Sequence, residues 1–250
     1  MSTARVYHPK GAKTVLSRLK RIYGAPKRPA ETDPIEQIVL AILARNEPLS
    51  KAQAILQRFR SYYVDFNELR VTQPGELVGY MGPNLPQALA KARRILSILK
   101  SIFDRENTFD LTFLQSKSKR ELESYFSQIQ GADNYLLASV ILHCCGRQAF
   151  PLDEKMLATC KELGLAEGEV SLEGMQSYLE RQLRSSESYA FCHLLKRRSC
   201  QETTGAKKAA KKKTSTTKRK QTKAGKLRSK GTGRSKSAAS RGSSRVKSRK

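Results

Sequence analysis

The chain has 250 residues, and its 48 lysine and arginine residues outnumber its 22 aspartate and glutamate residues, which gives a formal net charge of +26. No apolar run approaches the length of a membrane span, and the N-terminus lacks the apolar stretch of a secretory signal. These features argue against a membrane or secreted protein, and we expect a cytoplasmic one.

The basic residues are concentrated at the C-terminal end. Residues 201–250 hold 19 of them and one acidic residue, so this segment carries +18 of the net charge. It has few apolar side chains and no aromatic ones, which is too little to offset the entropy of ordering a chain. We therefore predict a disordered basic tail over 201–250, a folded domain over 14–200 and a flexible N-terminus over 1–13.

Helical periodicity dominates the predicted domain. The first helix covers 14–23, and the second begins at Asp33-Pro34, an N-cap carboxylate followed by proline at the first helical position. Further apolar stripes with helical spacing follow at 88–99, 137–145, 156–163 and 172–183. No segment alternates convincingly as a strand, so the sequence predicts an all-α fold.

The cysteine and histidine pattern gives no sign of a disulfide framework or a metal site. The cysteine count is odd, and Cys144 and Cys145 are adjacent on a helical apolar stripe, where small buried side chains are the ordinary interpretation. His143 and His193 have no Cys or His partner at metal-ligand spacing. We expect no metal and no cofactor.

One segment has a sharper pattern. The run from Ala149 through Phe-Pro-Leu to Asp153, followed by a helix that ends near Leu163-Gly164, resembles the catalytic-aspartate segment of the endonuclease III family of helix-hairpin-helix DNA glycosylases. The Asp33-Pro34 start, the Lys91-Ala92 pair and the segment 190–200 occur in the order of that family. The resemblance covers about residues 14–200. It implies two helical subdomains, a DNA-binding cleft between them and a hairpin that binds phosphate.

The resemblance assigns catalysis to Asp153. Cleavage of an N-glycosidic bond develops positive charge on the sugar, and a nearby carboxylate stabilises that charge or activates water. We expect this carboxylate to be exposed at the mouth of the groove, facing a flipped-out nucleotide. The alternative is that Asp153 only caps the helix that follows it.

The hairpin departs from the family pattern. Gly131 matches its first glycine, but Asp133 occupies the second glycine position, so the phosphate contact of Gly131 and Asn134 is in doubt. Tyr135 lies where the bifunctional enzymes carry a lysine, and tyrosine cannot form a Schiff base. The resemblance therefore implies a monofunctional enzyme. Lys155 is a possible substitute nucleophile, although contact with phosphate or solvent is the more ordinary role for it.

Two further positions relate to the family pattern. Cys200 matches the first ligand of the family's iron–sulfur cluster, but the next fifty residues contain no cysteine, so we expect that cluster to be absent. Asn46 lies near the place where the family carries a glutamine that fills the gap left by the flipped base. An asparagine that caps the end of a helix is the alternative for this position.

These observations favour a base-excision DNA N-glycosylase that acts on double-stranded DNA as a monomer, with weak or absent abasic-site lyase activity. The runner-up is a non-catalytic DNA-binding or nucleoid-associated protein that keeps the glycosylase scaffold. A third, weaker alternative is an abasic-site lyase that uses an unconventional amine. The basic tail fits association with the nucleoid, but its composition does not separate DNA from RNA.

Overall fold

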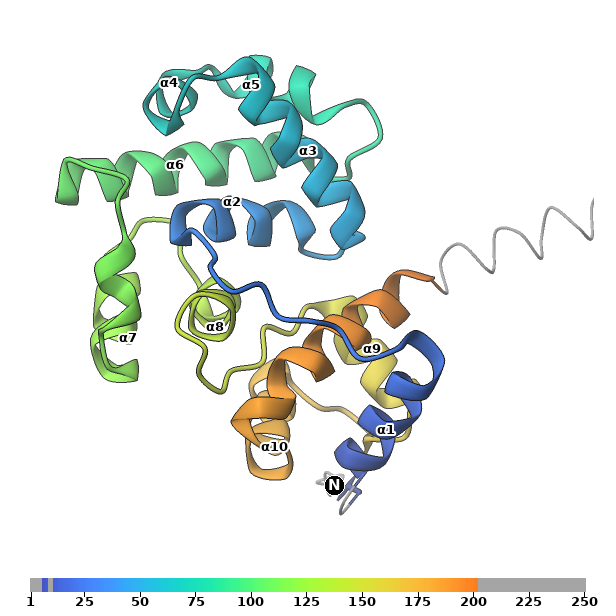
Figure 1. Ribbon diagram of the computed structural model, residues 1–250. Coiled ribbons are helices and arrows are strands. Elements are labelled where there is room, and N and C mark those ends of the chain that lie inside the picture. The colour runs from blue at the N-terminus through green and yellow to red at the C-terminus, as the bar shows by residue number, and fades with distance from the viewer. Residues whose placement is uncertain (1–5, 9–10, 202–250) are drawn as a thin grey trace, which may run out of the picture. The chain divides into compact units, whose positions relative to one another are not determined.

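A computed structural model describes residues 6–8 and 11–201, and within them nearly all regular structure is helical (Figure 1). The all-α prediction is confirmed. The elements are β1 (Val6–Tyr7), α1 (Gly11–Tyr23), α2 (Pro34–Ala44), α3 (Leu49–Tyr62), α4 (Phe66–Val71), α5 (Pro74–Met81), α6 (Ala88–Glu106), the 3-10 turn η1 (Thr112–Gln115), α7 (Lys119–Ser127), α8 (Asn134–His143), α9 (Glu154–Glu162), β2 (Ala166–Glu167), α10 (Leu172–Gln182) and a last helix over 185–201.

Helices α2 to α8 form one group, with α2 at its centre. Helix α2 contacts α3, α6 and α8, which explains why it is apolar on almost every side (Figure 1). Ile38, Val39 and Leu43 on this helix are fully buried. A helix that is hydrophobic all round needs neighbours on all sides, and α2 has them.

Helices α1, α9, α10 and the last helix form the second group. Helix α10 contacts α1 and α9, and Phe150 packs edge-on against Phe191 of the last helix, with ring centroids 6.1 Å apart. Strands β1 and β2 pair antiparallel beside these helices. Two paired residues per strand are too few for a periodicity signal, which is why the sequence did not predict them.

The start of α2 is formed as the sequence predicts. The Asp33 side chain accepts a hydrogen bond from the Ile35 N–H at 3.0 Å, and Pro34 occupies the first helical position. Caps of this kind stabilise a helix by about 1 kcal/mol. The loop over 24–33 precedes this start and connects α1 of the second helical group to α2 of the first.

The ends of the described region differ in part from the expected boundaries. Helix α1 begins at Gly11, three residues before the expected start of the domain, and Val6–Tyr7 is paired within the flexible segment predicted over 1–13. The last helix continues through residue 201, and residues 202–250 of the predicted tail lie outside the described residues. Among residues 6–8 and 11–201, no helix is both long and apolar enough to cross a membrane.

Candidate active site

Asp153 lies where the two helical groups meet, at the start of α9. It is the N-cap of that helix, and its Oδ1 accepts a hydrogen bond from the Met156 N–H at 2.9 Å. The residue has 0% exposed surface. The expectation that this carboxylate is exposed at the mouth of the groove is therefore wrong, because the loop after α2 and a side chain of the last helix cover it.

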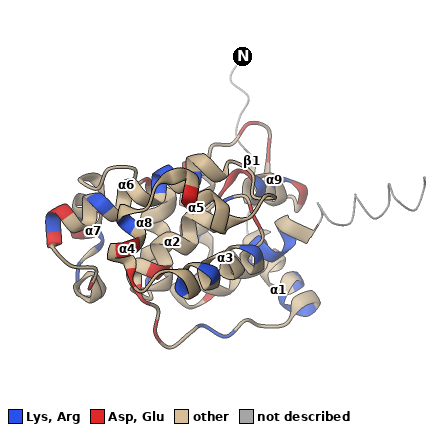
Figure 2. Ribbon diagram, turned by 90° about the horizontal axis from the view of Figure 1, so that it is seen from above, with Lys and Arg blue, Asp and Glu red and all other residues tan. Residues whose placement is uncertain are grey.

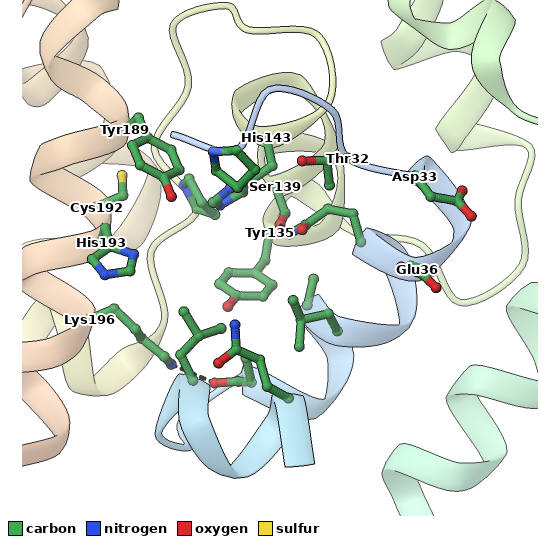
Figure 3. A pocket seen from close by; sticks show the side chains of 18 of the residues that line it. Thr32, Asp33, Glu36, Tyr135, Ser139, His143, Tyr189, Cys192, His193 and Lys196 are labelled. Carbon is green, nitrogen blue, oxygen red and sulfur yellow. Dashed lines mark hydrogen bonds between the residues drawn. The ribbon is translucent and has the colours of Figure 1, made fainter. Parts of the chain in front are cut away.

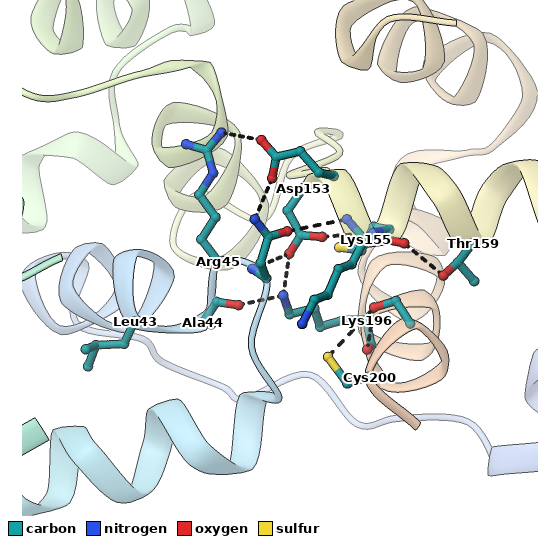
Figure 4. A network of polar contacts seen from close by, with 12 residues as sticks. Leu43, Ala44, Arg45, Asp153, Lys155, Thr159, Lys196 and Cys200 are labelled. Carbon is teal, nitrogen blue, oxygen red and sulfur yellow. Dashed lines mark hydrogen bonds and ion pairs between the residues drawn. The ribbon is translucent and has the colours of Figure 1, made fainter. Parts of the chain in front are cut away.

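The covering side chain is Lys196 of the last helix. Its Nζ forms an ion pair with Asp153 Oδ2 and donates a hydrogen bond to the Ala44 carbonyl at 2.5 Å. The Asn46 N–H also donates to Asp153 Oδ2, at 2.9 Å (Figure 4). Burial of a charge costs several kcal/mol unless the charge is paired and hydrogen-bonded, and these contacts compensate it.

Sequence reasoning missed Lys196, although a signal was present. Buried side chains recur every four residues along the last helix, at Ser188, Cys192, Lys196 and Cys200. A lysine on such a face is almost never fully buried unless it is paired. Its position therefore predicts a buried acidic partner, but the spacing alone does not say which one.

A pocket of about 310 Å³ opens beside this ion pair, between α2, α8 and the last helix (Figure 3). Its lining residues are Pro29, Glu31, Thr32, Asp33, Glu36, Gln37, Leu40, Ala41, Ala44, Leu49, Gln53, Tyr135, Ser139, His143, Pro151, Met156, Tyr189, Cys192, His193 and Lys196. Asp153 does not line the pocket, so the Lys196 side chain separates its carboxylate from the pocket space. The pocket thus presents an amine where the sequence predicts a carboxylate.

Tyr135 is on the wall of this pocket, as its match to the family's lysine position implies. Figure 3 shows its ring pointing into the space between α2 and the last helix. The Arg45 guanidinium lies over the ring, 5.3 Å from the centroid. Burial raises the pKa of Tyr135, and the charge of Asp153 raises it further. The Tyr135 phenol is therefore neutral at neutral pH.

Two histidines give the pocket further uncharged polar groups. Burial, together with the neighbouring charges of Arg28 and His193, lowers the pKa of His143 to about 4. Burial and Arg197 also lower the pKa of His193. The Tyr189 ring packs against both imidazoles, with centroids 5.5 Å and 5.9 Å away. At neutral pH this part of the wall is aromatic and uncharged.

The predicted hairpin is formed by α7, the turn over 128–133 and α8. Gly131 has φ +91°, a backbone conformation that glycine adopts without strain. Asp133 turns inward to cap α8, accepting from the Leu136 N–H at 3.0 Å, and it pairs with Arg45 and Arg94 at 2.5 Å and 2.8 Å. Burial acts to raise the pKa of Asp133, but these hydrogen bonds and charges lower it overall.

The charge on Asp133 is thus neutralised within the protein. The inward orientation removes the carboxylate that would otherwise repel phosphate, yet it also uses one of the backbone N–H groups that a hairpin offers to an anion. Asn134 is the first residue of α8 and is exposed. Whether Gly131 and Asn134 contact phosphate stays a prediction.

Asn46 and Lys155 lie within the same network. Asn46 follows the C-cap of α2 with a left-handed φ of 59°, and its amide donates to Glu154 Oε2 at 2.6 Å and accepts from the Lys155 N–H at 3.3 Å. The Lys155 side chain is half-buried. The structure brings Asn46 to Asp153, while the role of Asn46 in filling a DNA gap stays a prediction.

Lys91 is a second buried amine that the sequence did not single out for burial. Its Nζ donates to the carbonyls of Ile42, Leu43 and Arg45 at 2.8–3.0 Å, and so closes the C-terminal end of α2. Burial lowers the pKa of Lys91 to about 8, with Lys196 among the cations that add to this effect. Because all three of its hydrogens are used, Lys91 has a structural role.

The cysteines do not assemble into a metal site. Within residues 6–8 and 11–201, no three His, Cys, Asp or Glu side chains are grouped so that they could hold a metal ion. Cys144 and Cys145 are half-buried, and Cys200 is buried in the last described turn of the chain. Burial raises the pKa of the Cys144 and Cys145 thiols, which disfavours the thiolate forms that bind metals.

Comparison with known proteins identifies the fold. No family model and no curated protein match the sequence. Endonuclease III in a non-covalent DNA complex matches with a TM-score of 0.60 and 15% identity, over 76% of this chain and 85% of that chain. An 8-oxoguanine glycosylase/lyase from Clostridium acetobutylicum in complex with double-stranded DNA has a TM-score of 0.58 and 14% identity, over 75% and 68%.

A third solved structure is the 3-methyladenine DNA glycosylase MagIII of H. pylori, bound to 1,N6-ethenoadenine. It has a TM-score of 0.53 and 16% identity, over 74% of this chain and 94% of that chain. The three solved structures have one architecture in common with this chain. The chain has the fold of the helix-hairpin-helix DNA glycosylases.

Proposed function

We propose that this chain is a DNA N-glycosylase that binds an everted, damaged nucleotide in the pocket between α2, α8 and the last helix. The pocket volume of about 310 Å³ is at the lower end of the range of about 300–1,000 Å³ that is usual for ligand sites. Tyr135 and the neutral His143 offer aromatic faces, and Ser139 and Gln37 offer hydrogen-bonding groups. These are the features by which enzymes read a flipped base.

The observation that carries this proposal is the position of Asp153 directly behind a pocket-lining side chain. The Lys196 side chain lies between the carboxylate and the pocket, and its ammonium occupies the place beside Asp153 where a sugar with developing positive charge would be stabilised. Movement of Lys196 away from Ala44 would bring that sugar and the carboxylate together. The buried carboxylate would then act in surroundings of low dielectric constant, where its charge has a large effect.

Double-stranded DNA is the proposed partner. Figure 2 shows Lys and Arg residues along α1 and α3, and the sequence of α1 contains four basic residues and no acidic one. The net charge of +18 on residues 201–250 would add affinity for phosphate without sequence preference. Because Tyr135 cannot form an imine, base removal through Asp153 would use water, as in a monofunctional enzyme.

A second candidate function has its own support. Asp153 is fully buried, and its two oxygens accept from two backbone N–H groups and from Lys196, as expected for a structural carboxylate. In this case the chain would be a non-catalytic DNA-binding protein on a glycosylase scaffold. It would bind undamaged duplex as tightly as damaged duplex and would release no base.

Base release from duplexes that carry single lesions separates the two functions. The panel would include 8-oxoguanine, 3-methyladenine and 1,N6-ethenoadenine, and alkali would reveal the abasic sites. We expect cleavage at one lesion or more, and a loss of at least 100-fold in Asp153→Asn. Asp65→Asn is the matched control, because Asp65 caps α4 and is exposed. No release from any lesion, with equal affinity for normal duplex, would establish the non-catalytic alternative.

Asp153→Asn leaves Lys196 without its acidic partner, so loss of activity has to be separated from loss of structure. The variant Asp153→Asn/Lys196→Met removes both charges and serves as the second test, with thermal unfolding measured for each protein. If this double variant folds as stably as the wild type and still releases the base at the wild-type rate, Asp153 is not the catalytic residue.

A further inference from the structure

The lining of the pocket contains a single primary amine, that of Lys196. Lysine is missing from position 135, where the resemblance to the bifunctional glycosylases would place it. The Lys155 side chain does not line the pocket, and the three ammonium hydrogens of Lys91 are bonded to carbonyls. An electrophilic sugar carbon in this pocket would therefore meet the Lys196 amine and no other.

We propose that Lys196 is an amine nucleophile that forms a Schiff base with the C1′ aldehyde of an abasic deoxyribose, with Asp153 as its proton acceptor and donor. This inference rests on the proposed function only in requiring that a deoxyribose enters the pocket. It assigns to the last helix a chemical role that the hairpin position, with Tyr135, does not supply.

Asp153 accepts and returns the protons that move when Lys196 forms the imine. The Lys196 ammonium gives a proton to the Asp153 carboxylate through their direct contact and becomes a neutral amine. The amine attacks C1′ and forms a carbinolamine. Asp153 returns the proton to the departing hydroxyl group, water leaves, and an iminium ion remains. Asp153, again ionised, takes a proton from C2′, the C3′–O bond breaks so that the 3′ phosphate leaves with the electron pair, and water hydrolyses the imine and frees the lysine.

The surroundings of Lys196 leave space for this movement. A second cavity of about 450 Å³ adjoins the first, and the two cavities have Leu49, Gln53, His193 and Lys196 in common. Lys196 is thus part of the wall between two open spaces.

Two nearby lysines lack these features. Lys51 donates to Glu47 at 2.7 Å and to the Asn84 carbonyl at 2.7 Å, and it lines neither cavity. Lys155 is the second residue of α9, two residues after Asp153, but the Asp153 carboxylate pairs with Lys196 instead. The acid–amine pair needed for imine chemistry is that of Asp153 and Lys196.

Borohydride trapping of the full chain on duplex DNA with one abasic site tests the assignment. We expect a covalent complex whose modified peptide, identified by mass spectrometry, contains Lys196. Lys196→Arg keeps the positive charge next to Asp153 but cannot form an imine, and its trapping should be at least 10-fold slower. Lys100→Arg, which alters an exposed lysine paired with Asp104, should trap at the wild-type rate.

Peptide mapping on the wild-type chain keeps the test valid even if Lys196→Arg folds poorly. Modification at Lys155 or at a lysine within 201–250, or no trapping at all, would overturn the assignment. Abasic DNA carries no base, so this result does not depend on glycosylase activity. Base release by the wild-type chain without any trapping would support the proposed function while rejecting the imine.

Discussion

Replacement of Lys196 by methionine should destabilise the folded domain by about 3 kcal/mol. The removal of one partner of a buried ion pair typically costs about 3–5 kcal/mol, because the other charge stays buried without compensation. Asp153 has 0% exposed surface and the Lys196 side chain 10%, so water cannot replace the ammonium without a rearrangement.

The structure places the expected value at the lower end of that range. Asp153 keeps its hydrogen bonds from the N–H groups of Met156 and Asn46, each 2.9 Å long, and these stabilise the orphaned carboxylate. The Ala44 carbonyl also loses its donor, which adds about 1 kcal/mol. Methionine fills a volume similar to that of lysine, so the cavity contribution is small.

Urea unfolding of full-length variants at pH 7 measures this value in a double-mutant cycle. Asparagine is as good an N-cap as aspartate, so Asp153→Asn/Lys196→Met should lie within about 1 kcal/mol of the wild type. The exposed pair Lys100 and Asp104 provides the matched cycle, with an expected coupling of about 0.5 kcal/mol. Equal coupling energies in the two cycles would refute the conclusion that burial governs the Asp153 pair.

Three further predictions concern the groups around the site. Lys91→Met should lower the free energy of unfolding by about 2–4 kcal/mol, because three carbonyls at the end of α2 lose their donor, and urea unfolding at pH 7 measures it. The folded-state pKa of His143, about 4, is below its unfolded value, so the unfolded chain binds the proton first and stability falls as the pH drops from about 6.5 to 4. The loss should be at most about 3 kcal/mol and absent from His143→Gln in unfolding curves across that pH range. Gly131→Ala should lower the free energy of unfolding by about 1 kcal/mol, because the positive φ of Gly131 strains an alanine. Gly79→Ala should raise it by up to about 1 kcal/mol, because Gly79 lies within α5 and its Cβ would meet open space. Thermal unfolding of both variants measures these opposite changes.

The helices were predictable because their signals are local. Asp33 and Pro34 mark the start of α2 through cap chemistry within three residues. The apolar residues on almost every side of α2 predict that other helices pack around it. Gly131 and the helix after it likewise follow from turn chemistry and periodicity. These features depend on neighbours in sequence, which a single chain displays directly.

The surroundings of Asp153 were not predictable in the same way. Lys196 is 43 residues away along the chain and Asn46 is 107, and no spacing rule connects an acid to partners at such separations. A capping aspartate and an exposed catalytic aspartate have the same local pattern, Leu-Asp followed by a helix. Only the packing of the last helix against the end of α2 decides that this one is buried.

The neutral side chain of Tyr135 and the ammonium of Lys196 are related through the positive charges near Asp153. Arg45 already lies over the Tyr135 ring, and Lys91 and Lys196 both lie at the end of α2 near Asp153. An additional ammonium at position 135 would repel these cations, by on the order of 3 kcal/mol for unit charges about 5 Å apart at the effective dielectric constant of such sites. A neutral side chain at 135 is therefore what allows a lysine at 196. The acid at 153 accommodates one amine, and in this chain the last helix provides it.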